Sequence, residues 1–95
     1  MGKFYFVTNY SVTNPEAYAD YPKLVGATQQ GLARRLIAGT GEVVEGEPGD
    51  RTVVLEFESR KDYEKWYHSP AYQEILPLRK DNSEGWAIVI EEYNG

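Results

Sequence analysis

Residues 48–67, PGDRTVVLEFESRKDYEKWY, contain a turn, a strand and the start of a helix in one run. Within this run, Val53, Leu55 and Phe57 alternate with other residues, which is the pattern of a strand over 52–58. Ser59 follows as a helix cap with Asp62 at the third helical position, a variant of the capping box. The run therefore predicts a strand that leads directly into a helix.

The predicted helix carries an apolar face of three aromatic residues at helical spacing, Tyr63, Trp66 and Tyr67. Ser69 and Pro70 repeat a cap followed by proline, so a further helix starts there. One face of this helix holds Tyr72, Ile75, Leu76 and Arg79. Residues 81–83 end the helix, and 86–93 (WAIVIEEY) predict the last strand.

Upstream of the quoted run, Pro48-Gly49-Asp50 predicts the turn of a hairpin. The partner strand is predicted over 33–38. Residues 39–41 (GTG) indicate a bulge or turn, and we expect 42–46 to continue the strand beyond it.

The first ten residues alternate aromatic and β-branched side chains and predict another strand. Asn14-Pro15-Glu16 then predicts the start of a helix that runs to about Gln30, with a kink or short break at Pro22. The expected apolar face of this helix is Ala17, Tyr18, Tyr21, Leu24 and Val25.

The resulting order βαββαβ predicts an α+β, ferredoxin-like fold: a four-stranded antiparallel sheet with helices on one face. The opposite face would still offer apolar groups, either Phe4 and Phe6 or Tyr5 and Val7, together with Val54 and the Trp86 or Val89 side of the last strand. An open apolar sheet face is unfavourable in water. We therefore expect two copies to pack through it into a homodimeric α+β barrel.

Composition limits the possible functions of this 95-residue chain. Its length predicts a single domain over residues 1–95. The net charge of −5 and the lack of a Lys/Arg cluster argue against nucleic acid and anionic membranes as partners. No apolar run is long enough to span a bilayer and no signal peptide is recognisable, so a cytoplasmic location is expected. Without cysteine and with His68 as the only histidine, we expect no metal site, and we expect no cofactor.

The second half of the chain resembles a known family. The residues that carry the likeness are Glu45-Gly46, Glu56-Phe57, the run WYHSPAYQ over 66–73, and Leu78-Arg79. On these residues the chain is similar to the domain of unknown function 1330 family within the dimeric α+β barrel superfamily. The resemblance implies the fold and the dimer, and it implies no established reaction.

Arg79 is the most informative candidate for a functional residue, because helical spacing directs its guanidinium toward the sheet, where a charge needs a partner. One interpretation is structural: an ion pair, with Glu45 and Glu56 as the natural partners, or the capping of carbonyl groups near the helix end. The other is an anchor for a carboxylate or another anion.

The remaining candidates each have a plain structural alternative. Tyr21, Trp66, Tyr67 and Tyr72 form either core packing or, with Arg79 and Glu45, the wall of a ligand pocket. Glu56 is a candidate general base or acid if it is desolvated, and otherwise a paired structural glutamate. His68 is a candidate catalytic residue, although we expect it to face solvent.

Two functions remain open from the sequence. The first is cofactor-independent binding or conversion of a small anionic or aromatic metabolite in a pocket between sheet and helices. The second is a non-catalytic dimeric accessory or stress protein with a closed core. The sequence does not decide whether the protein is an enzyme.

Overall fold

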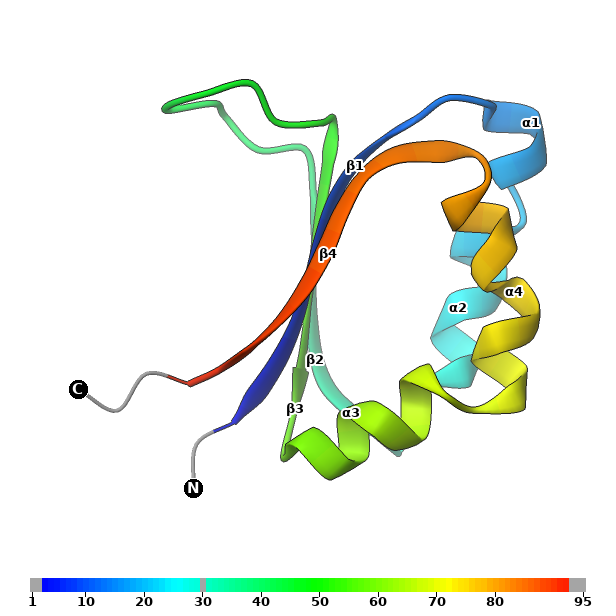
Figure 1. The fold of residues 1–95 in the computed structure, drawn as a ribbon, viewed down its shortest axis with the longest axis vertical. Coiled ribbons are helices and arrows are strands. Elements are labelled where there is room, and N and C mark those ends of the chain that lie inside the picture. The colour runs from blue at the N-terminus through cyan, green and yellow to red at the C-terminus, as the bar shows by residue number, and fades with distance from the viewer. Residues whose placement is uncertain (1–2, 30, 93–95) are drawn as a thin grey trace.

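The computed structural model describes residues 3–29 and 31–92. Its four strands form one antiparallel sheet in the order β2-β3-β1-β4. The strands are β1 (Phe4–Val12), β2 (Ala33–Gly39), β3 (Arg51–Phe57) and β4 (Ser83–Glu91). The helices are α1 (Pro15–Tyr18), α2 (Tyr21–Thr28), α3 (Arg60–Tyr67) and α4 (Pro70–Lys80). All of these helices lie on one face of the sheet (Figure 1), so the predicted ferredoxin-like fold is confirmed.

The helix starts follow the predicted caps. The Asn14 side chain accepts a hydrogen bond from the Ala17 amide at 3.3 Å. Ser59 caps α3 in the same way at 3.3 Å, and Ser69 caps α4 at 3.2 Å. The predicted break in the first helix is also present, but it precedes Pro22, because α1 ends at Tyr18 and the proline occupies the first turn of α2.

The connection between β2 and β3 differs from the prediction. Gly39 pairs with Thr52 as the last pair of the hairpin, and 42–46 does not continue the strand. The chain leaves the sheet there and projects on the side away from the helices (Figure 1), so it has no neighbouring strand with which to pair. The register irregularity lies at Ala33 to Arg35 rather than in 39–41.

The last strand also has other bounds than predicted. β4 begins three residues early, at Ser83, and ends at Glu91. The early start follows from β1, which extends to Val12 and pairs with Ser83 there. Tyr93, the predicted end of the strand, lies outside the described residues.

The core lies between the sheet and the helices. It consists of Phe4, Phe6, Tyr10, Tyr18, Tyr21, Leu55, Phe57, Trp66, Tyr72, Ile75 and Leu76. Leu24, predicted on the apolar face of the first helix, is instead 45% exposed. Within α2 the buried side follows Tyr21 and Val25, four positions apart, and leaves Leu24 outside the core.

The opposite sheet face is uncovered. Because Phe4 and Phe6 are buried under the helices, the open face carries Tyr5 and Val7. Strand pairing aligns Val7 with apolar residues of both neighbouring strands, whereas Tyr5 pairs with Ile90 on β4 and with Glu56 on β3. The apolar and aromatic residues of the open face are Tyr5, Val7, Ile37, Val54, Trp86, Ile88 and Ile90, and the polar residues Asn9, Arg35, Thr52 and Glu56 lie on the same face.

Candidate functional site

A cavity of about 180 Å³ lies between the helix-covered face of the sheet and α2. Strands β1, β2 and β3 form one wall, and α2 with Trp66 of α3 and Arg79 of α4 forms the other. Most of the lining is apolar or aromatic, and no aspartate or glutamate lines it. We call this space the inner cavity.

Arg79 is the buried charge of the inner cavity. It lies in the last turn of α4, and only 7% of its surface is exposed. Its guanidinium carbon lies 5.8 Å from the ring centre of Tyr10 and 6.0 Å from that of Tyr21, within the range of cation–π attraction. Its Nη2 donates a long 3.5 Å hydrogen bond to the Tyr72 hydroxyl, while its buried Nε has no hydrogen-bond partner.

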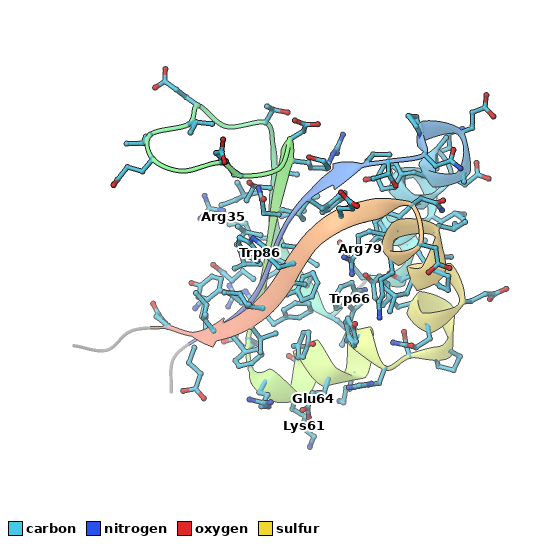
Figure 2. The ribbon with its side chains drawn as sticks, turned by 45° about the horizontal axis from the view of Figure 1, so that its top comes forward. Arg35, Lys61, Glu64, Trp66, Arg79 and Trp86 are labelled. Carbon is cyan, nitrogen blue, oxygen red and sulfur yellow. The ribbon has the colours of Figure 1, made fainter. Side chains whose placement is uncertain are left out.

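The ion pair of Arg79 with Glu45 or Glu56, one of the interpretations drawn from the sequence, is absent within the described part of the chain. Glu45 is exposed in the β2–β3 connection, which projects on the far side of the sheet (Figure 1). Glu56 points to the open face, where its Oε1 accepts a 3.4 Å hydrogen bond from the Tyr5 hydroxyl. The sheet itself therefore separates Glu56 from the guanidinium (Figure 2 shows Arg79 on the helix side).

Two pairs of tyrosine hydroxyls lie in the same part of the core as Arg79, and one of them includes the Tyr72 hydroxyl that the guanidinium contacts. The hydroxyls of Tyr10 and Tyr18 lie 2.7 Å apart, and those of Tyr21 and Tyr72 lie 2.8 Å apart. Burial raises the pKa of Tyr10, and its hydrogen bond with Tyr18 raises it further. Burial likewise raises the pKa of Tyr21, with Tyr72 adding to the effect. Both phenols thus stay protonated at neutral pH and do not act as bases; within each pair one hydroxyl donates and the other accepts.

The Arg79 guanidinium stays charged in this setting. Burial alone lowers its pKa, and the neighbouring Tyr72 and Tyr21 hydroxyls raise it by more, so the net shift is upward. The site thus combines a permanent positive charge with neutral hydroxyl groups. That combination suits an anion that accepts hydrogen bonds.

The structure brings together most of the aromatic residues predicted for a pocket. Tyr21 and Trp66 line the inner cavity beside Arg79. Trp66 is held in place because its indole Nε1 donates to Thr28 Oγ1 at 2.9 Å. Tyr72 is fully buried behind this wall and reaches the cavity through its contacts with Tyr21 and Arg79.

A second cavity, of about 310 Å³, lies beside β4 and also reaches Arg79. The predicted pocket residue Tyr67 lines this space instead of the inner cavity. Tyr10 and Arg79 line both spaces, so they separate an apolar cavity from a more polar one. We call the second space the outer cavity.

The remaining candidates lie away from both cavities. His68 is exposed at the end of α3, as expected. No group of three or more His, Asp or Glu side chains suited to a metal ion occurs in residues 3–29 and 31–92. Over the same residues, no helix has the length and apolar character needed to cross a membrane.

Several cavity residues were not predicted from the sequence. Three hydroxyl-bearing residues, Thr8, Tyr10 and Tyr18, belong to the lining, and so does a second arginine, Arg51. The alternating pattern of the first strand placed Tyr10 on the same face as Phe4 and Phe6, which indicates core rather than a site. Arg51 and Tyr10 lie side by side because β1 and β3 pair in this register, which the sequence does not reveal.

Solved structures with this fold come from several bacteria. A protein of unknown function from Rhodopseudomonas palustris is 16% identical with a TM-score of 0.77, over 99% of this chain and 85% of that one. SnoaB, a cofactor-independent oxygenase from Streptomyces nogalater, is 10% identical with a TM-score of 0.74, over 100% of this chain and 97% of that one. A dimeric ferredoxin-like protein of unknown function from Thermobifida fusca is 8% identical with a TM-score of 0.72, over 96% of this chain and 92% of that one.

These similarities concern the fold alone, because all of the identities are low. The structural neighbours include proteins described as dimeric with a ferredoxin-like fold, and the fold is what this chain shares with them. No match was found among curated proteins. The sequence matches the Domain of unknown function (DUF1330) family over residues 3–93, and the chain belongs to that family.

Proposed function

We propose that the inner cavity binds a small aromatic carboxylate, with Arg79 as its anchor. The observation that carries this proposal is a buried guanidinium that lacks an acidic partner among the described residues and has an unpartnered Nε. A buried charge without a counter-charge is costly to maintain. A ligand carboxylate would supply the missing charge and accept from the fork of N–H groups.

The size and lining of the cavity support an aromatic ligand. An engineered apolar cavity of about 150 Å³ is known to hold benzene, and the inner cavity measures about 180 Å³. Phe6, Leu55 and Trp66 line it and provide an apolar surface for one ring. The Tyr10–Tyr18 pair uses one of its two hydroxyl protons within the pair, and the other can be donated to an oxygen of the ligand.

The accessory-protein alternative is a closed core filled by the protein's own side chains, and an ion pair of Arg79 with Glu45 or Glu56 would favour it. The positions of Glu45 and Glu56 argue against that arrangement and favour binding. Conversion of the ligand is a further step. The fold also occurs in a cofactor-independent oxygenase, and this likeness is an analogy of architecture.

We also propose that two copies pair through the open face. Ile37, Val54, Val7 and Ile88 form a continuous apolar row across all four strands. Trp86 and Ile90 extend this row as half-exposed side chains on β4. Such a contiguous patch favours association in water, and structural neighbours described as dimeric support the same arrangement.

The binding proposal is tested by thermal denaturation with benzoate. A ligand at 100 times its Kd adds about 2.7 kcal/mol, which corresponds to roughly 10–20 °C in Tm for a domain of this size. Arg79→Gln should abolish this increase. Arg60→Gln is the matched control, because Arg60 is an exposed arginine of α3 that pairs with Glu64, and it should retain the increase.

The outcome that contradicts the proposal is specific. If a panel of benzoates leaves the Tm of the wild-type protein unchanged at millimolar concentration, the inner cavity is not a carboxylate site. An equal increase in wild type and Arg79→Gln would place the carboxylate elsewhere on the protein.

A further inference from the structure

A second arginine faces the inner cavity. Arg51 begins β3 and pairs with Tyr10 of β1 in the sheet register. Paired residues in neighbouring strands point to the same side of the sheet, and Tyr10 is buried on the helix side. Arg51 therefore lines the inner cavity together with Arg79. Unlike Arg79, Arg51 is exposed and lies at the border of the cavity.

The backbone around Arg51 is held by Asn9. The buried Asn9 side chain donates to the Arg51 carbonyl at 3.3 Å and to Thr52 Oγ1 at 3.0 Å. Its Oδ1 accepts from the Gly49 amide at 2.7 Å. Gly49 packs so closely that a Cβ there would lie 2.6 Å from the Tyr10 carbonyl carbon. These contacts fix the start of β3 beside Tyr10 and leave the Arg51 side chain free to interact with a ligand.

The charges of the cavity are unbalanced. Arg51 and Arg79 both line it, no Asp or Glu does, and neither arginine forms an ion pair within the described residues. This positive cavity belongs to a chain whose net charge is −5. One carboxylate would neutralise only one of the two guanidinium groups.

We propose that the ligand is a dianion: an aromatic ring with one carboxylate at Arg79 and a second acidic group at Arg51. This inference rests on the proposed function and extends it. The volume of about 180 Å³ accommodates one ring. The second acidic group lies at the exposed border, where it keeps part of its hydration while it contacts Arg51.

The test is calorimetric titration at one fixed ionic strength with benzoate and the three benzenedicarboxylate isomers. In the wild-type protein, the isomer whose geometry fits should bind about fivefold more tightly than benzoate, as expected for one added, partly exposed ion pair. Arg51→Gln should remove this advantage, so that the dicarboxylate and benzoate bind with similar Kd values. Arg60→Gln carries the same charge change outside the cavity and should behave like wild type.

Each result is decisive. If benzoate binds and no dicarboxylate binds more tightly, the dianion proposal is wrong and the carboxylate site stands. The dianion proposal is also wrong if Arg51→Gln weakens benzoate and dicarboxylate equally, because the effect is then one of general charge. If none of the four compounds binds, the proposed function fails and the dianion proposal fails with it.

Discussion

Replacing Arg79 by Met tests whether this arginine stabilises the protein or is kept for a ligand. The side chain loses two cation–π contacts near the 6 Å limit, together worth about 1–2 kcal/mol. It also loses a 3.5 Å hydrogen bond, which is long and therefore weak. The substitution also removes the desolvation penalty of an unpaired buried charge, which is worth several kcal/mol and is smaller where water in the cavities hydrates the guanidinium.

The balance predicts that Arg79→Met is between equally stable and about 2 kcal/mol more stable than wild type in the absence of ligand. At about 4–8 °C per kcal/mol, the Tm rises by zero to roughly 15 °C. Thermal unfolding at one protein concentration measures this, because the Tm of an associating protein depends on concentration. Lys80→Met, an exposed neighbour, is the control and should stay within about 0.5 kcal/mol. A loss of more than about 2 kcal/mol in Arg79→Met would refute the reasoning and show a structural arginine.

Three further predictions concern the sheet, the phenols and the open face. Gly85→Ala should lower the free energy of unfolding by about 1–3 kcal/mol in urea denaturation, because the new Cβ would lie 2.1 Å from the Asn9 carbonyl oxygen. Gly41→Ala is the control: a Cβ there would have no atom within 4 Å, and the stability should hardly change. Folding raises the pKa of Tyr10 and Tyr21 above the usual value of a tyrosine, about 10. The unfolded chain therefore loses these protons first, and the stability of the fold should decrease as the pH rises above about 10. The measurement is phenolate absorbance against pH in the folded protein, and a normal titration of both tyrosines would contradict this prediction. Ile88→Asp should convert the proposed dimer into a folded monomer, as measured by light scattering at micromolar concentration. Lys61→Asp on α3 is the control and should leave the dimer intact. A monomeric wild-type protein would argue against the interface.

The sequence predicted the elements well because local chemistry determines where they start. Asn14, Ser59 and Ser69 each form the cap that their position indicates, and Arg79 lies on the buried face that helical spacing assigns to it. These features depend on residues three or four positions apart. The strand ends and the β2–β3 connection were predicted less well, because they depend on whether a neighbouring strand is present to pair.

The partners of Arg79 could not be predicted in the same way. Glu56 is excluded by the sheet face on which it lies, and that face is set only when the strands pair in register. The two hydroxyl pairs join residues that lie eight and 51 positions apart, and no local pattern signals such contacts. Arg51 became a cavity residue for the same reason, through its pairing with Tyr10.

The most direct test of the Arg79 anchor is an NMR titration that observes arginine Nε–H signals while benzoate is added. The Nε of Arg79 has no partner in the structure and should gain one when a carboxylate binds. The account predicts a large, saturable shift of one arginine Nε–H signal that is missing from the spectrum of Arg79→Gln. An unchanged Arg79 signal at millimolar benzoate would contradict it.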